Sequence, residues 1–267
     1  MERFNRFLAK YYLPIYVICS VLWIALYYWT VDYLKVLSLI LMWCSILLTA
    51  RFLGSRWLAL LKKPMEILDD TCDPYPYMEE LQRQNNYSGP WTLKYNRVIL
   101  QAGALMRVGS SEEAYALLLP LQEKLFQSQQ PRGLQTIYCD CLANVCRALD
   151  RAEEAEYWHA KRMELLAKVK NKRIQQKFAE RTPMYMAHYH TFRKEYEISI
   201  QFLQQQKPKN KYEQVSASMV YARNAVAMGE TEKAKEALTF VVENGNKLYI
   251  ASQARQMLAE LENTAEK

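Results

Sequence analysis

Glycine is scarce in this sequence, with 7 among 267 residues, and histidine is rarer still, with 3. The chain contains neither G-x-G-x-x-G nor G-x-x-x-x-G-K-[ST], so the familiar glycine-rich cradles for nucleotide phosphates are absent. No Ser-His-Asp or Cys-His arrangement can be recognised, although such a site can also be assembled in space from distant residues. We therefore expect a protein without catalysis and without a cofactor.

Charged residues are missing from two long stretches near the N-terminus. Residues 11–31 and 36–50 are apolar and are parted only by the short turn 32–35. About 20 helical residues span the hydrocarbon core of a bilayer, so the first stretch is long enough. The second reaches only about 22 Å as a helix, but Lys35 and Arg51 at its ends can snorkel to the headgroups. With so short a turn, we expect an antiparallel transmembrane hairpin.

Two other interpretations of these stretches are a cleavable signal peptide and a buried helix pair of a soluble protein. The first stretch is too long for a signal peptide and ends in Tyr27, Tyr28 and Trp29 rather than in small residues. A buried pair normally has a polar face, whereas charge is absent from every face of both segments. The aromatic residues at the turn instead suit the interfacial belt of a membrane span.

The cations around the hairpin predict its orientation. Residues 1–63 hold eight Lys or Arg against two acidic residues, and most of these cations precede or follow the hairpin. By the positive-inside rule both ends face the cytoplasm, so we expect an integral protein of the plasma membrane whose termini and remaining domain are cytoplasmic. The same excess explains most of the formal charge of +7, because residues 64–267 hold 27 basic against 26 acidic residues. Nucleic acid is therefore not an expected partner.

The six cysteines raise the question of a disulfide framework or a metal site. Disulfides are not expected, because the chain is neither small nor secreted under this topology. A zinc site drawn from Cys139, Cys141, Cys146 and His159 lacks the paired spacing of zinc fingers. Cys139 and Cys146 instead fall seven residues apart on one helical face, so we expect core residues and no metal.

Composition divides the chain into four parts. After the hairpin the chain continues as a juxtamembrane helix that Pro64 is expected to end, which closes a first part at 1–63. Residues 64–90 carry six acidic side chains and several breakers, which predict a connector with one or two short helices. A calcium site would need fixed ligand offsets, so a solvated spacer is favoured. A helical domain, 91–262, and a polar tail, 263–267, follow.

From residue 91 onward apolar residues recur at intervals of three and four, and the alternation typical of strands is missing, which predicts an all-α domain. One local arrangement returns four times: a turn, acidic or polar residues, and a small residue that opens a second helix. The four copies run over residues 108–114, 149–155, 193–199 and 228–234. Each turn needs a residue that tolerates positive φ, and each second helix needs a small residue where it crosses the first.

This arrangement resembles the tetratricopeptide-repeat family, and the resemblance covers roughly residues 91–262. On the first helices of the second and fourth copies, the packing positions of the family are occupied by Cys139, Leu142, Ala143, Cys146, Tyr221, Ala222 and Ala225. The small residues that open the second helices are Ala114, Ala155, Ser199 and Ala234. They lie 41, 44 and 35 residues apart, against about 34 in the family, so the repeats are degenerate, with longer helices or loops in the middle. The resemblance implies an α-solenoid of about four helix pairs, followed by a capping helix at 249–261.

The resemblance also implies a binding site. In such a stack, the first helix of each pair lines a concave groove that receives an extended or helical peptide. The candidate groove residues are polar or aromatic side chains beside the packing positions: Tyr95, Asn144, Arg147, Tyr189, Arg193, Tyr221 and Asn224. His188 and His190 fall on different helix faces because residues two apart diverge, so they are not expected to form a metal pair.

The strongest local charge lies in residues 160–181, where eight cations stand against two acidic residues. The cations are Lys161, Arg162, Lys168, Lys170, Lys172, Arg173, Lys177 and Arg181. A solvated helix and loop is the simplest interpretation. A patch for anionic lipid headgroups or an acidic peptide is a second, and a patch for RNA is a third.

The function we expect is that of a membrane-anchored scaffold that binds an unknown protein or peptide partner through its concave face. One alternative is a structural subunit whose hairpin packs inside a larger membrane assembly, which Trp43, Ser38, Ser45 and Thr49 would suit. Another is a binder of anionic lipid through the basic residues between 161 and 181.

Overall fold

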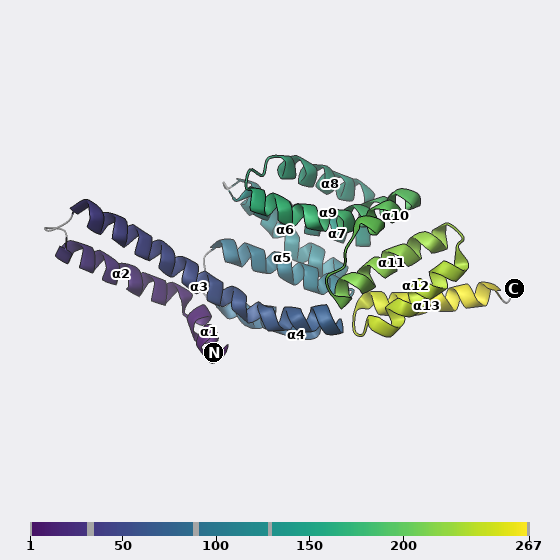
Figure 1. The fold of residues 1–267 in the computed structure, drawn as a ribbon, viewed down its shortest axis with the longest axis horizontal. Coiled ribbons are helices and arrows are strands. Elements are labelled where there is room, and N and C mark those ends of the chain that lie inside the picture. The colour runs from purple at the N-terminus through teal and green to yellow at the C-terminus, as the bar shows by residue number, and fades with distance from the viewer. Residues whose placement is uncertain (1, 31–34, 88–90, 128–129, 266–267) are drawn as a thin grey trace. The chain divides into compact units, whose positions relative to one another are not determined.

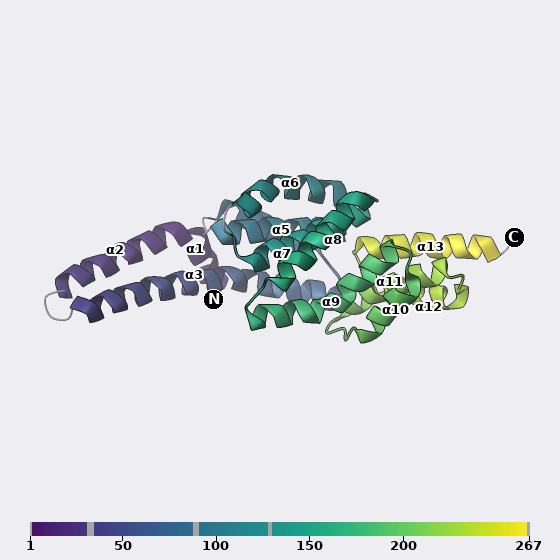
Figure 2. The same cartoon turned by 90° about the horizontal axis from the view of Figure 1, so that it is seen from above.

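The computed structural model describes residues 2–30, 35–87, 91–127 and 130–265. Within these ranges the chain forms thirteen α-helices and one 3-10 helix and no strand, so the expected all-α class is confirmed (Figure 1, Figure 2). The helices are α1 (Glu2–Lys10), α2 (Tyr12–Thr30), α3 (Lys35–Thr71), α4 (Tyr75–Arg83), η1 (Gln84–Asn86), α5 (Trp91–Arg107), α6 (Ser111–Gln127), α7 (Arg132–Ala148), α8 (Ala152–Ala167), α9 (Lys172–Phe192), α10 (Tyr196–Gln205), α11 (Lys211–Ala227), α12 (Thr231–Asn244) and α13 (Tyr249–Ala265). The chain divides into a first unit, Met1–Glu66 with Tyr77–Arg97, and a second unit, Ile67–Pro76 with Val98–Lys267.

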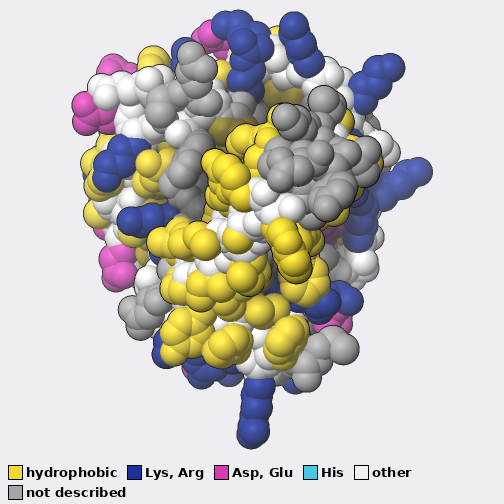
Figure 3. All heavy atoms as spheres, turned by 90° about the vertical axis from the view of Figure 1, so that its left-hand side faces the viewer, with side chains coloured by type: hydrophobic (Ala, Val, Ile, Leu, Met, Phe, Trp, Pro, Cys, Tyr) yellow, Lys and Arg dark blue, Asp and Glu magenta, His cyan; other side chains and the backbone are white. Residues whose placement is uncertain are grey.

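In the first unit, α2 and the N-terminal half of α3 run side by side in opposite directions in both views (Figure 1, Figure 2). The expected turn at 32–35 lies almost wholly outside the described residues. Among the residues that the structure describes, two helices are long and apolar enough to cross a membrane, over Tyr12–Trp29 and within Leu39–Thr71. Their large apolar side chains are mostly exposed, and Leu22 and Leu47 keep 63% and 65% of their surface. Figure 3, which looks at the hairpin end, shows hydrophobic side chains gathered on that face.

A small core and a buried ion pair complete the first unit. Leu8, Tyr12 and Leu53 pack together where α1, α2 and α3 meet. Arg6 on α1 lies 2.8 Å from the carboxylate of Glu80 on α4, and this carboxylate also accepts a hydrogen bond from Gln84. Glu80 is only 2% exposed, so the prediction of a solvated acidic spacer is wrong at this residue. The carboxylate is buried because a cation and an amide from the same unit satisfy it.

The prediction that Pro64 ends the juxtamembrane helix is also wrong. Helix α3 passes through Pro64 and continues to Thr71. A proline inside a helix removes one backbone hydrogen bond, which disfavours the helix without forbidding it. Leu60, Leu61 and Leu68 are 6%, 3% and 4% exposed, so the turns before and after Pro64 are fixed by burial. Tertiary packing outweighs the lost hydrogen bond, as it also does at Pro120 in α6 and Pro183 in α9.

The second unit repeats one turn four times, between α5 and α6, α7 and α8, α9 and α10, and α11 and α12. The residues with positive φ in these turns are Gly109 (+89°), Asp150 (+54°), Lys194 (+62°) and Gly229 (+76°). In each turn the next N–H donates across five residues to a carbonyl of the first helix at 2.9 Å; the pairs are Ser110 to Leu105, Arg151 to Cys146, Glu195 to His190 and Glu230 to Ala225. This is the Schellman closure of a helix, and the expected need for positive φ is confirmed at all four turns.

A small residue follows each turn and is buried. Ala114, Ala155, Ser199 and Ala234 are 0%, 2%, 0% and 0% exposed, as expected for positions where two helices cross closely. Helix α9 has 21 residues, more than any other helix from α5 to α13, which accounts for the widest spacing of the repeats. The expected lengthening in the middle of the domain is therefore present.

The second unit also has contacts between its first and last elements. Tyr249, which opens α13, packs so closely on Gly109 that a Cβ added there would lie 2.6 Å from the ring. Arg107 on α5 lies over the ring of Tyr212 on α11, 5.0 Å from its centroid. In addition, Lys247 pairs with Asp73 at 2.7 Å. The α5–α6 turn, the end of α3 and the start of α13 therefore belong to one packed body.

Candidate functional site

The seven predicted groove residues lie on four helices, α5, α7, α9 and α11, with Arg193 at the C-terminal end of α9. Tyr95 belongs to the first unit and is half-buried, and Tyr221 is half-buried on α11 of the second unit. On α7, Arg147 donates from Nη2 to Oδ1 of Asn144 at 2.6 Å. Tyr189 and Arg193 belong to a network on α9, described next.

Tyr189 and Arg193 both bind Glu156 of α8. The Tyr189 hydroxyl donates to this carboxylate at 3.0 Å, and Arg193 Nη1 donates to it at 3.1 Å. Arg193 also donates from Nε to Glu195 at 3.0 Å, and Glu195 lies 2.6 Å from Nδ1 of His190. The network is half exposed and joins α8 to α9, so its side chains are already engaged with one another.

Asn224 is fully buried, so its assignment to an open groove is wrong. Its amide donates to Ser199 Oγ at 2.8 Å and accepts from Thr191 Oγ1 at 2.8 Å. Ser199 in turn donates to the carbonyl of Ala187 at 2.9 Å. A polar side chain is stable in this core because α9 and α10 supply a partner for both ends of the amide.

The basic residues between 161 and 181 separate into three groups. Lys161 and Lys168 pair with Glu164, and their hydrogen bonds, that of Lys168 first, lower the pKa of Glu164 to about 2. Exposed cations in the α8–α9 loop and on α9 are Lys170, Lys172, Arg173, Lys177 and Arg181. Arg162 is 0% exposed, so its assignment to a surface patch is wrong. Its side chain extends from α8 and contacts Asp140 on α7 and Tyr185 on α9.

Arg162 belongs to a cluster that we name the arginine cluster: Asp140 and Arg147 on α7, Arg162 on α8 and Tyr185 on α9. The guanidinium carbon of Arg162 lies 3.8 Å from the centroid of the Tyr185 ring, and that of Arg147 lies 4.9 Å from it. Arg162 Nε lies 3.5 Å from Oδ1 of Asp140. Three helices of the second unit thus bring two cations, one carboxylate and one aromatic ring together.

Burial sets the electrostatics of the arginine cluster. A quarter of the Asp140 side chain is exposed, yet loss of water raises the pKa of its carboxyl against the opposing effect of Arg162, Arg147 and Arg181. On α9, burial and the nearby cations Arg147 and Arg223 lower the pKa of His188 to about 3. Because His188 is neutral and burial disfavours the ionised form of Asp140, positive charge dominates in the cluster.

His159 adds a second neutral ring beside the cluster. Its Nδ1 lies 3.0 Å from the Tyr185 hydroxyl, and its ring stacks on Tyr189 with centroids 3.7 Å apart. Burial, and after it the charge of Arg147, lowers the pKa of His159 to about 4. The imidazole therefore carries no charge at neutral pH and cannot offset or add to the charges of the arginines.

Several buried polar atoms of the cluster have no hydrogen-bond partner among the residues that the structure describes. They are Nε and Nη2 of Arg162, Nη1 of Arg147 and Oδ1 of Asp140. Buried donors without partners are costly, and in folded proteins they are normally satisfied by protein, water or a ligand. Among the described residues, the cluster therefore gathers several polar atoms of the second unit whose hydrogen-bonding capacity is unused.

The sequence locates part of this cluster. Asp140, Asn144 and Arg147 share one face of α7 because residues three, four and seven apart align on a helix. The opposite face carries Cys139 and Cys146, which are 0% exposed. Sequence reasoning singled out Asn144 and Arg147 but missed Asp140 and Tyr185, and the spacing on α7 was the available signal for Asp140. Nothing local marks Tyr185, because only tertiary packing brings α9 to α7 and α8.

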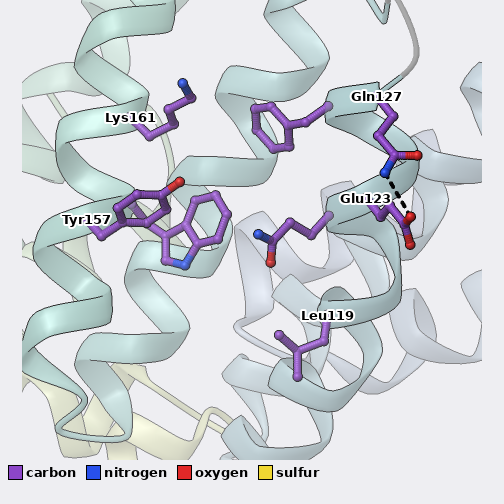
Figure 4. A pocket seen from close by; sticks show the side chains of 8 residues that line it. Leu119, Glu123, Gln127, Tyr157 and Lys161 are labelled. Atoms are coloured by element: carbon purple, nitrogen blue, oxygen red, sulfur yellow. Dashed lines mark hydrogen bonds between the residues drawn. The ribbon is translucent and has the colours of Figure 1, made fainter.

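A pocket of about 470 Å³ lies between α6 and α8 (Figure 4). Tyr157 and Trp158 on α8 and Phe126 on α6 form its aromatic part, and the Tyr157 and Trp158 rings are 4.9 Å apart. Glu123 and Gln127, bonded to each other at 2.8 Å, and Lys161 line its polar side. The volume suits a small ligand or a side chain, but Glu123 and Gln127 are paired with each other and Lys161 is paired with Glu164.

The cysteines of α7 lie in environments that suppress their reactivity. Burial raises the pKa of Cys139 and Cys141 to about 12 and that of Cys146 to about 11. Thiols with such pKa values remain protonated at neutral pH and are poor nucleophiles and metal ligands. Among the described residues, no group of three or more His, Cys, Asp or Glu side chains is placed to hold a metal ion.

Comparison with known proteins gives no match that bears on this geometry. No family model matches the chain. No curated protein and no solved structure matches it either.

Proposed function

We propose that the protein is a membrane-anchored scaffold whose helical repeats bind a protein partner. The membrane part of the proposal is supported by α2 and α3, whose large apolar side chains face outward where a soluble protein would place polar ones. The cations that precede α2 and follow the apolar part of α3 support cytoplasmic termini by the positive-inside rule. The plasma membrane is the proposed compartment.

The observation that carries the binding proposal is the fourfold repetition of one turn in the second unit. Repeated helix pairs of tetratricopeptide-like form stack with their first helices on a common face, which suits capture of an extended or helical segment. Here the first helices are α5, α7, α9 and α11. On α7 the residues proposed to contact the partner are Asn144 and Arg147, which are hydrogen-bonded to each other.

Protease access in sealed vesicles tests the topology. With the cytoplasmic side outward, protease should digest the repeats and leave a protected fragment that contains α2 and the apolar part of α3. Digestion only when the opposite side faces outward would reverse the orientation. Complete digestion from either side would refute insertion. Fractionation of the cells from which the vesicles are prepared tests the assignment to the plasma membrane.

Partner capture tests the binding face. The full chain is cross-linked in membranes, extracted in mild detergent and compared with a double variant, Asn144→Ala with Arg147→Gln. The variant should lose at least one partner that the parent chain captures, whereas Arg255→Gln on the exposed surface of α13 should keep it. An identical set of partners for all three chains would contradict the assignment of the face.

A second candidate function is that of a structural subunit whose hairpin is the main contact. It is supported by the large side chains that α3 leaves exposed, among them Trp43 at 57% and Leu48 at 65%. The hydroxyl of Thr49 donates to the Ser45 carbonyl at 2.8 Å, so contacts by this helix would rest on packing rather than on that hydroxyl. Replacing residues 11–50 by an unrelated hairpin separates the two functions, because a scaffold keeps its partners and a structural subunit loses them.

A further inference from the structure

The arginine cluster carries more positive than negative charge, and Glu156, the carboxylate that acts on the adjacent His159, is already bound by Tyr189 and Arg193. Arg147 and Arg162 are cations, whereas Asp140 supplies a single carboxylate. His159 and His188, the nearest titratable rings, are neutral at neutral pH because burial lowers the pKa of each. Arg181 and Arg223 add further positive charge to the same neighbourhood, since they act on Asp140 and His188 respectively.

The excess positive charge is buried rather than solvated. Arg162 has no exposed surface, and Arg147 is 9% exposed. A guanidinium taken out of water loses much hydration free energy, which is recovered only when its N–H groups are bonded and its charge is paired. Cation–π contact of both guanidiniums with the Tyr185 ring offsets part of the lost hydration free energy. Nη1 of Arg147 and Nη2 of Arg162 remain without acceptors among the described residues.

The cluster is not sealed on every side. Asp140 keeps 25% of its side chain exposed, and Arg181, close enough to act on its carboxyl, is exposed on α9. Asp140 therefore marks a side on which the cluster meets solvent. Arg162 lies deeper and contributes positive potential in a region of low dielectric, where charge acts more strongly than in water.

We propose that Arg147, supported by Arg162, binds a carboxylate of an acidic segment in a partner protein. The planar guanidinium matches a carboxylate through two parallel hydrogen bonds, and a bound carboxylate reduces the excess positive charge of the cluster. Asp140 repels a phosphate dianion more strongly than a carboxylate, because the repulsion grows with the charge of the ligand. The identification of the partner as a protein rests on the function proposed above, whereas the preference for a carboxylate rests on the cluster alone.

Fluorescence anisotropy with the full chain in a non-ionic detergent tests the site. The probes are a fluorescein-labelled peptide of alternating glycine and glutamate and a matched peptide of glycine and glutamine. The glutamate peptide should bind at least about tenfold more tightly than the glutamine peptide, and Arg147→Gln should weaken it by about tenfold or more. Equal binding of the two peptides would overturn the proposal.

Two further variants make the result specific. Arg255→Gln removes the same charge from an exposed site on α13 and should leave binding unchanged. Asp140→Asn removes the competing carboxylate while keeping its shape, so it should tighten binding several-fold. This gain also tests the site if Arg147→Gln fails to fold. An equal loss in Arg147→Gln and Arg255→Gln, or no gain in Asp140→Asn, would show that binding follows overall charge and would refute the cluster.

Competition distinguishes a carboxylate site from a phosphate site. Sodium phosphate should displace the glutamate peptide no better than sodium chloride of equal ionic strength. Displacement by phosphate at much lower ionic strength, or stronger binding of a single-stranded RNA than of the peptide, would refute the carboxylate assignment. If cross-linking still captures a protein partner while the glutamate peptide does not bind, the scaffold function stands and only this site fails.

Discussion

Helices α2 and α7 are both well formed and similar in length, yet they distribute apolar surface in opposite ways. Leu22 of α2 keeps 63% of its surface exposed, whereas Leu142 of α7 is 0% exposed. Helix α2 has no charged residue, whereas α7 carries Asp140 and Arg147. The more apolar helix is thus the more exposed one. A count of apolar residues alone says nothing about which medium a helix faces.

The physical reason lies in the periodicity. Helix α7 places its apolar residues on one face, which packs against neighbouring helices and leaves polar residues on the other. Helix α2 is apolar on all faces, so no single neighbour can cover it. Burial in a hydrocarbon phase satisfies such a surface, because that phase contacts every face at once. If α2 spans a membrane, as proposed above, the two regions are stabilised by different surroundings, and mutations should separate them.

The largest expected effect is that of Leu142→Asp. A carboxylate buried without a partner costs more than about 4 kcal/mol, which is comparable to the stability of a typical domain. The second unit should lose its cooperative unfolding transition, measured by circular dichroism of the full chain in detergent. Leu22→Asp is the matched control, because the same change on α2 should leave that transition in place. Loss of the transition in both variants would erase the distinction between the regions.

A smaller effect, in the opposite region, is expected for Leu22→Arg. A cation at the centre of a membrane-spanning helix costs about 3 kcal/mol of insertion free energy. The fraction of the chain that alkaline carbonate extracts from membranes should rise. Ile198→Arg, at a residue of α10 that is 41% exposed, should leave the extracted fraction unchanged. If Leu22→Arg behaves like Ile198→Arg, then α2 faces water and its apolar surface needs another explanation.

Local signals in the sequence predict much of both regions. The absence of charge from 11–31 and 36–50 indicates the two apolar helices, and the four turns are predicted at the residues where φ is positive. The small residues after these turns, such as Ala114 and Ser199, are buried as expected. These features depend on residues close in sequence, for which steric preference and periodicity are sufficient.

The failures involve contacts between distant segments. Asn224 is assigned to a groove because polar residues usually face water, but Thr191 and Ser199 satisfy its amide inside the core. Arg162 is assigned to the surface for the same reason, and Tyr185 on the next helix holds it inside. Pro64 does not end α3, because packing on both sides outweighs its local preference. Each outcome depends on a partner that periodicity does not identify.

The buried network of Asn224 provides an intermediate effect. Asn224→Ala leaves Ser199 Oγ without its donor and Thr191 Oγ1 without its acceptor, and we expect a loss of about 2 kcal/mol in unfolding free energy. Arg193→Ala removes hydrogen bonds from the half-exposed network on α9 and should cost less than about 1 kcal/mol. Denaturant titration of the full chain in detergent measures both. Equal losses would mean that burial does not separate these networks.

The smallest expected effects concern the four repeated turns. Gly229 has φ of +76° with no atom near the position of a Cβ, so Gly229→Ala should cost about 1 kcal/mol through backbone strain alone. Lys194 occupies the equivalent position with φ of +62° and an exposed side chain. Lys194→Gly relieves that strain but adds freedom to the unfolded chain, so the net gain should stay below about 1 kcal/mol. Gly109→Ala should cost more than Gly229→Ala because the added Cβ meets the Tyr249 ring.

These three variants are informative as a set, because they share one backbone geometry and differ only in what surrounds it. Thermal unfolding of the full chain in the same detergent should give the lowest melting temperature for Gly109→Ala. Gly229→Ala should melt at a higher temperature, and Lys194→Gly at the highest of the three. If Lys194→Gly is strongly destabilising, the lysine side chain contributes contacts that its exposure does not suggest. If Gly109→Ala and Gly229→Ala lower the melting temperature equally, then the Tyr249 ring moves away from the added Cβ at little cost in free energy. In that case the contact between the α5–α6 turn and α13 is weak in solution, and the second unit is held together chiefly by its neighbouring pairs.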